Sequence, residues 1–161
     1  MGAVRRVADL IPAGEVLQIR GPAGTLISGL AYDSRQVRPG DLFAALEGLH
    51  TDGHLFIEAA VERGAAAVLH SRPLSGYRPG LCYLQARDAR RILSALSAAF
   101  FGHPSRDLTV IGVTGTDGKS TTVWFIHQLL EALGRSSGFL STVHLQADRE
   151  RRQALAEGRI M

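Results

Sequence analysis

The chain has 161 residues, of which 45% are hydrophobic and 20% charged, and its formal net charge is +3. These proportions are ordinary for globular proteins, and the length suffices for one domain, or for a small domain and part of a second. A single cysteine, Cys82, excludes a disulfide scaffold or a cysteine-metal cluster within one chain, and no apolar run is long enough to span a membrane. No basic stripe interleaved with aromatic residues supports nucleic-acid binding. Arg5 and Arg6 precede no sustained apolar run, so secretion is disfavoured and the cytoplasm is expected.

Strand and helix patterns follow one another over the first hundred residues. The sequence predicts a short helix at 4–11, strands at 15–19, 26–32, 42–46, 65–69 and 81–84, and helices at 54–63 and 89–101. Gly64 is expected to end the second of these helices, and Asp88 to cap the third. Short, continuously apolar strands such as 65–69 are typical of sheets covered on both faces, so we expect an α/β fold. Cys82 is interpreted as a small buried side chain.

The most informative pattern lies at residues 108–122. An apolar run at 108–113 enters a glycine-bearing loop, and Lys119 with its following hydroxyls opens an amphipathic run that reaches about Leu133. Strand, glycine loop and helix in this order indicate a phosphate-binding loop, because glycines turn backbone N–H groups inward and the helix N-terminus favours an anion. The predicted phosphate-binding residues are Gly115, Thr116, Asp117, Gly118, Lys119, Ser120 and Thr121.

Within this loop, Lys119 is predicted to reach the β- and γ-phosphates of a nucleoside triphosphate, and Ser120 or Thr121 to hold Mg²⁺. Two features depart from the general pattern: Val113 stands where a glycine is usual, and the Asp117 carboxylate repels phosphate unless a cation intervenes. The alternative is a glycine-rich turn without a ligand.

The pattern weakens towards the end of the chain. Residues 137–140 are predicted to form a second strand of the nucleotide-binding sheet. From Gln146 onward the sequence is dense in charge, so we expect a solvated or frayed tail; a helix supported by pairs such as Asp148–Arg152 is the alternative.

Two stretches resemble the Mur ligases, the ATP-dependent amide-forming enzymes of peptidoglycan precursor synthesis. The first runs from Tyr32-Asp33-Ser34-Arg35 through residues 36–46 and 48–57 to 64–68. The second is Gly112-Val113-Thr114-Gly115-Thr116-Asp117-Gly118-Lys119-Ser120-Thr121-Thr122, preceded by His103-Pro104-Ser105. Together they cover about residues 28–143. The loop and the Asp-Ser-Arg segment resemble most the ligase that adds the third peptide residue, and the D-Ala-D-Ala-adding ligase is the nearest competitor.

The resemblance implies a division of labour along the chain. Residues 1–105 would form a small mixed-sheet domain that binds the UDP-muramoyl substrate through Tyr32, Ser34, Leu49, His50 and Thr51. Residues 106–161 would open a Rossmann-like ATP-binding domain and leave it incomplete. Lys119 would be catalytic, stabilising the γ-phosphoryl group in transfer, while Ser120 and Thr121 would serve Mg²⁺ and phosphate. Asp117 replaces the asparagine usual in this loop.

The activity that the resemblance implies is formation of an amide bond between UDP-N-acetylmuramoyl-L-Ala-D-Glu and a diamino acid, with ATP and Mg²⁺. A monomer without nucleic-acid or membrane partners is expected. Because the resemblance fades after Val143, the chain is interpreted as the front part of a ligase that forms no amide alone. The alternatives are a non-catalytic nucleotide- or UDP-sugar-binding module and a fragment that does not fold stably.

Taken on their own, the residues of the first domain leave further possibilities open. The Asp33-Ser34-Arg35 segment suits a surface turn as well as a site. His50 and His54 suit exposed or capping positions, and Asp41 is expected to fix a turn.

Overall fold

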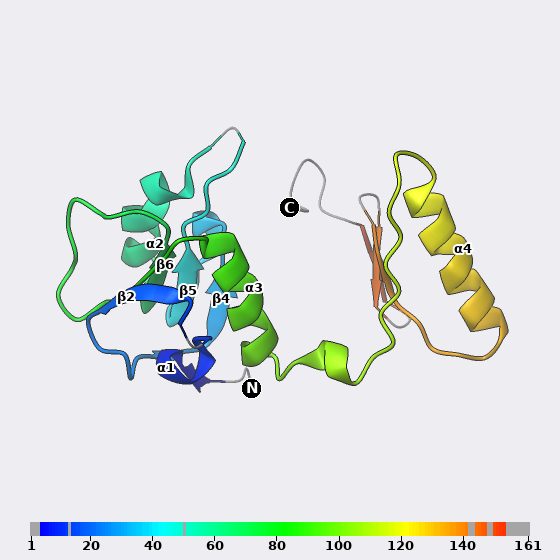
Figure 1. The fold of residues 1–161 in the computed structure, drawn as a ribbon, viewed down its shortest axis with the longest axis horizontal. Coiled ribbons are helices and arrows are strands. Elements are labelled where there is room, and N and C mark those ends of the chain that lie inside the picture. Colours follow the sequence, from blue (N-terminus) through cyan, green and yellow to red (C-terminus); the bar gives the residue numbers. More distant parts are fainter. Residues whose placement is uncertain (1–3, 13, 50, 142–143, 148–149, 154–161) are drawn as a thin grey trace. The chain divides into compact units, whose positions relative to one another are not determined.

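The computed structural model describes residues 4–12, 14–49, 51–141, 144–147 and 150–153 (Figure 1). The chain divides into two compact units, Met1–Leu108 and Thr109–Met161. The assignment of residues 1–105 and 106–161 to two functional domains stays a prediction.

A five-stranded sheet forms the centre of the first unit (Figure 1). Its order is β2-β7-β6-β5-β4. The strands are β2 (Val16–Arg20), β4 (Gly29–Ala31), β5 (Asp41–Ala44), β6 (Ala67–His70) and β7 (Cys82–Ala86). β4, β5, β6 and β7 are parallel, and β2 pairs antiparallel with β7 at the edge. The mixed α/β class expected from the sequence is confirmed.

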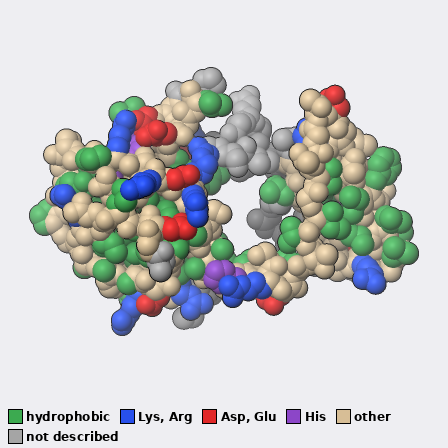
Figure 2. All heavy atoms as spheres, viewed as in Figure 1, with side chains coloured by type: hydrophobic (Ala, Val, Ile, Leu, Met, Phe, Trp, Pro, Cys, Tyr) green, Lys and Arg blue, Asp and Glu red, His purple; other side chains and the backbone are tan. Residues whose placement is uncertain are grey.

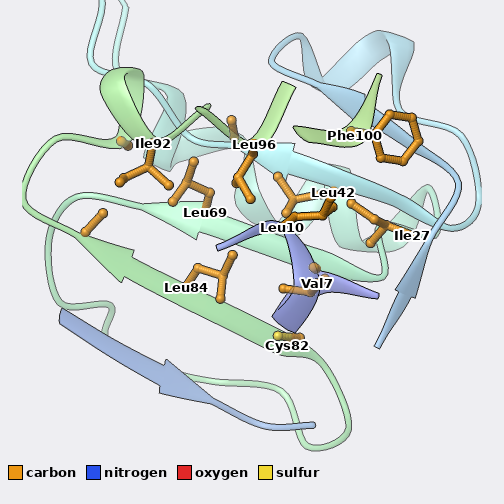
Figure 3. Packing of buried hydrophobic residues seen from close by; sticks show 14 of the residues in the cluster. Val7, Leu10, Ile27, Leu42, Leu69, Cys82, Leu84, Ile92, Leu96 and Phe100 are labelled. Carbon is orange, nitrogen blue, oxygen red and sulfur yellow. The ribbon is translucent and has the colours of Figure 1, made fainter. Parts of the chain in front are cut away.

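Helices cover both faces of this sheet, and the alternation of side chains along each strand explains why. One face packs against α1 (Val7–Leu10) and α3 (Ala89–Phe100), whose Val7, Leu96 and Phe100 join strand residues in one buried cluster (Figure 3). The other face packs against α2 (Ile57–Glu62). Successive strand residues enter opposite clusters, as the period of two requires. The first cluster takes Leu42, Ala44, Ala67, Leu69, Cys82 and Leu84, and the second takes Phe43, Val68 and Tyr83.

Three local predictions are confirmed, two by hydrogen bonds and one by a backbone angle. The Asp88 carboxylate caps α3 by accepting the Arg91 N–H at 2.9 Å. Gly64 ends α2 with φ +95°, a left-handed conformation that glycine adopts at little cost. The Asp41 carboxylate accepts the Arg38 N–H at 2.9 Å and so fixes the turn before β5.

Two elements near the start of the chain differ from expectation. Residues 4–11 were expected to be one helix, but they form β1 (Arg5–Arg6) and only one turn, α1. The strand expected at 26–32 is divided at Ser28 into β3 (Leu26–Ile27) and β4. β3 pairs with β1 while β4 pairs with β5, because the Ser28 N–H bonds to the Gly40 carbonyl and turns the chain between two sheets.

The second unit contains α4 (Lys119–Ala132) and a small antiparallel sheet of order β10-β9-β8, with β8 (Phe139–Leu140), β9 (His144–Ala147) and β10 (Glu150–Gln153). The helix expected after the loop is confirmed, and Gly134 ends it with φ +71°. β8 falls within the strand expected at 137–140, but it pairs with β9 as part of a hairpin. The frayed tail expected from Gln146 onward and its helical alternative are both wrong at 146–147 and 150–153, which pair as β9 and β10; residues 148–149 and 154–161 lie outside the described residues.

The strand expected at 108–113 is not formed. A strand exists only through pairing, and these residues have no neighbouring strand in the described part of the chain, so Leu108, Val110 and Ile111 are exposed. The same lack of partners explains a further difference on α4. The amphipathic pattern of this run predicts that Phe125, Leu129 and Leu133 are buried, yet they are 60%, 61% and 66% exposed. Figure 2 shows hydrophobic side chains gathered at the surface over this helix.

Within the described residues, no helix is both long and apolar enough to cross a membrane.

Candidate nucleotide and substrate sites

The predicted substrate residues emerge from one edge of the sheet. β4 and β5 are parallel neighbours, with Ala31 opposite Phe43, so the segments that follow them leave the sheet at the same carboxyl edge. Tyr32 and Ser34 follow β4, and Leu49 and Thr51 follow β5. Ligands of parallel α/β proteins bind at this edge. His50 lies outside the described residues.

The segment after β4 is a turn that side-chain hydrogen bonds hold in place. The Asp33 carboxylate accepts the Arg35 N–H at 3.0 Å and forms two bonds with the Arg35 guanidinium, at 3.0 and 2.9 Å. This fixes the short 3-10 turn η1 (Ser34–Gln36). The Ser34 side chain is half-buried within it, and Tyr32 is 44% exposed beside it. The turn interpretation is confirmed, and ligand contact by Tyr32 and Ser34 stays a prediction.

A tight loop follows β5 and carries the other predicted substrate residues. The Gly53 N–H donates to the Leu46 carbonyl at 2.8 Å, the Gly48 N–H donates to the Thr51 carbonyl at 2.9 Å, and Glu47 and Asp52 form an antiparallel bridge. At Gly53 a Cβ atom would lie 2.6 Å from backbone atoms of Leu46, so glycine is required for this closure. Beyond the bridge, Leu49 is 98% exposed. A large apolar side chain that is exposed to water at this edge is available to a ligand.

Behind this loop lies a hydrogen-bond network that the sequence did not reveal. The Asp52 Oδ1 atom accepts both the His54 N–H at 3.0 Å and the His54 Nδ1–H at 2.7 Å. The His54 Nε2 atom accepts the Ser71 N–H at 3.2 Å, and the Ser71 hydroxyl donates to Glu47 Oε1 at 3.1 Å. Hydrogen bonds from His54, and after them the charge of Arg72, hold the pKa of Asp52 below its ordinary value.

His54 therefore differs from its expected role. Its side chain is only 4% exposed, neither a surface group nor a simple cap. The sequence places it two residues from Asp52 but seventeen from Ser71, and only the parallel pairing of β5 with β6 brings Ser71 to it.

A pocket of about 230 Å³ adjoins the network at the same edge of the sheet. Glu47, Ser71, Arg87 and Arg90 are among its lining residues, and they follow β5, β6 and β7. The Arg90 guanidinium donates to the Glu47 carbonyl at 2.9 Å, which ties the start of α3 to the start of the loop.

The predicted phosphate-binding residues form an open loop at the start of α4. Gly115 and Gly118 have φ values of +152° and +74°, conformations that other residues rarely adopt. No side chain caps the helix at Gly118, so the N–H groups of the first turn face solvent without a capping acceptor. Lys119 Nζ donates to the carbonyl oxygens of Gly115 and Thr116 at 2.5 and 2.8 Å, which holds the ammonium over the loop. Free N–H donors and a fixed cation suit a phosphate chain.

The hydroxyls of Ser120 and Thr121 lie in the first turn of α4, where Ser120 is half-buried and Thr121 exposed. The described residues contain no group of three histidine, cysteine or acidic side chains able to hold a metal ion. A hydroxyl beside a phosphate-binding loop fits Mg²⁺, which keeps several waters and takes its other ligands from phosphate.

The fold and the loop together define the class: an α/β protein with a glycine-rich, lysine-bearing loop at a helix N-terminus. Comparisons with known proteins then identify the family. The model described as "Mur ligase family, catalytic domain" matches residues 26–106. The chain is 53% identical over 117 residues to a UDP-N-acetylmuramyl-tripeptide synthetase of Treponema pallidum, covering 73% of this chain and 22% of that protein.

Other similar proteins carry related names. A UDP-N-acetylmuramoyl-L-alanyl-D-glutamate–2,6-diaminopimelate ligase of Alkaliphilus metalliredigens is 37% identical over 138 residues, covering 86% of this chain and 28% of that protein. A solved UDP-N-acetylmuramoylalanyl-D-glutamyl-2,6-diaminopimelate–D-alanyl-D-alanyl ligase of Acinetobacter baumannii is 32% identical, with a TM-score of 0.53 over 68% of this chain and 24% of that one. The chain thus belongs to the Mur ligase family and spans about a quarter of the length of these relatives.

Proposed function

We propose that the chain supplies the substrate-binding unit and the phosphate-binding loop of an ATP-dependent Mur ligase in peptidoglycan precursor synthesis. Its type would be the one that adds a diamino acid as third residue to UDP-N-acetylmuramoyl-L-Ala-D-Glu. The names of the two sequence relatives support this type. A monomeric state and a cytoplasmic location are part of the proposal.

The proposal that the chain binds a nucleotide rests on the identity of residue 119. The chain has 17 arginines and a single lysine, and that lysine is the first residue of α4, directly after the loop glycine Gly118. Arginine serves every other basic position, whereas a phosphate-binding loop needs a compact point charge on a flexible stem. The lone lysine stands where this requirement applies.

The residues divide the work according to their positions. The nucleotide would supply the phosphoryl group that activates the substrate carboxylate for amide formation. The N–H groups around Gly118 would bind the phosphate chain, Lys119 would neutralise charge on the transferred group, and Ser120 and Thr121 would hold Mg²⁺. Leu49 and Thr51, with Tyr32 and Ser34, would hold the uridine diphosphate end at the carboxyl edge of the sheet.

A second type, the D-alanyl-D-alanyl-adding ligase, is favoured by the solved structure at TM-score 0.53. Both types share the two sites proposed here. They differ in the peptide of the muramoyl substrate, so competition between the UDP-muramoyl dipeptide and the UDP-muramoyl tripeptide would separate them.

The test is calorimetric titration of the chain with Mg-ATP and, separately, with UDP-N-acetylmuramoyl-L-Ala-D-Glu. We expect both to bind without turnover. Lys119→Ala should weaken Mg-ATP alone, and Leu49→Ala should weaken the UDP-muramoyl dipeptide alone. Absence of binding by either ligand to the wild-type chain would refute the corresponding half of the proposal, and turnover would refute the expectation that this part forms no amide alone.

A further inference from the structure

The side chains behind the Leu49 loop join both ends of that loop to a third segment of the fold. Glu47 opens the loop and Asp52 closes it. Both are connected to Ser71, the first residue after β6: Glu47 directly through the Ser71 hydroxyl, and Asp52 through His54. A loop whose two ends are tied to a neighbouring strand loses less freedom when it binds a ligand.

The protonation of His54 follows from its partners. Because the Asp52 carboxylate only accepts hydrogen bonds, Nδ1 of His54 carries the proton, and Nε2 is left as an acceptor. The Ser71 N–H fills that acceptor at 3.2 Å. Arg72 adds an ion pair to the second Asp52 oxygen. Every charged group of the network thus has an opposite charge or a hydrogen-bond partner.

The same residue types form the nucleophilic triads of hydrolases, but the bonds here differ. In a triad the histidine nitrogen is free to take the serine proton. Here Nε2 already accepts the Ser71 backbone N–H at 3.2 Å; the Ser71 Oγ also lies 3.3 Å from Nε2, but its proton is directed to Glu47 Oε1 at 3.1 Å. The network therefore holds the backbone in place and does not activate a nucleophile.

We infer that His54 and Ser71 are positioning residues for the nucleotide-sugar substrate: they fix the loop that presents Leu49 and Thr51 at the carboxyl edge of the sheet. This rests on the proposed function. They act through the loop, across which the described residues show a backbone hydrogen bond from the Gly48 N–H to the Thr51 carbonyl.

The first experiment compares Ser71→Ala with Ser71→Thr, which keeps the hydroxyl, using UDP as the probe. We expect Ser71→Ala to weaken UDP binding by about tenfold and to speed amide hydrogen exchange at Gly48 and Gly53, since a bond to a carboxylate is lost. Ser71→Thr should bind UDP within about twofold of wild type. Mg-ATP affinity should stay unchanged in both variants.

A double-mutant cycle with Leu49→Ala separates positioning from general stability. If Ser71 acts through the loop, its substitution should cost little once Leu49 is truncated, so the two effects are not additive. Additive effects, or unchanged UDP affinity in Ser71→Ala, would overturn the inference. If the wild-type chain fails to bind UDP, the proposed substrate site is refuted as well. Faster amide exchange at Gly48 and Gly53 in Ser71→Ala would then show that Ser71 fixes the loop without a role in substrate binding.

Discussion

Replacing each of two leucines by alanine tests two positions in the first unit, one in its core and one in the loop after β5. Leu96 lies on α3 and is completely buried among the residues of the first cluster, whereas Leu49 is 98% exposed. Leu96→Ala removes apolar contacts and leaves a cavity, which should cost about 3 kcal/mol. For a unit of this size that lowers the unfolding midpoint by roughly 4–8 °C for each kcal/mol. Leu49→Ala should change stability by less than about 0.5 kcal/mol.

The assay can follow each unit separately. All three tyrosines lie in the first unit and the single tryptophan, Trp124, lies in the second. Near-ultraviolet dichroism of tyrosine in urea should therefore shift for Leu96→Ala, while tryptophan fluorescence excited at long wavelength should not. A cost above about 1 kcal/mol for Leu49→Ala, or below that value for Leu96→Ala, would refute the assignment of core and ligand-facing positions.

Three further substitutions or reactions test separate features. Gly21→Ala should cost about 1–3 kcal/mol, because φ is +84° and a Cβ would lie 2.1 Å from a backbone carbonyl oxygen, whereas Gly24→Ala, with open space around it, should be near neutral in urea unfolding. Burial lowers the pKa of His70 from its ordinary value of 6.5. Below pH 6.5 the unfolded chain therefore binds a proton at this histidine more readily than the folded chain does. The free energy of unfolding should fall as the pH is lowered through this range, and it should fall less in His70→Asn. Cys82 is buried and burial raises its thiol pKa, so an aromatic disulfide reagent should label it only in denaturant; rapid labelling of the native chain would contradict this.

Elements with strong local signals could be predicted from the sequence. The α3 helix has a capping aspartate and a regular apolar stripe, and the strands of the parallel sheet are short apolar runs bounded by turns. The glycines before Lys119 likewise predict backbone turns with positive φ, because glycine adopts such angles at little cost. These features depend on neighbours in the sequence.

Features that depend on pairing partners could not be predicted. Residues 108–113 have the composition of a strand, but a strand needs a neighbour, and the described chain offers none. The division at Ser28 likewise arises because β3 and β4 find partners in different sheets. The link from His54 to Ser71 joins residues seventeen apart, and no periodic pattern connects them.

The most direct test of the account uses the fact that Lys119 is the only lysine. The rate at which its amine is acetylated can be measured by mass spectrometry, with the N-terminal amine as internal reference. The account predicts that Mg-ATP at ten times its Kd slows acetylation of Lys119 by about tenfold, while UDP does not. An acetylation rate that is the same with and without saturating Mg-ATP would contradict it.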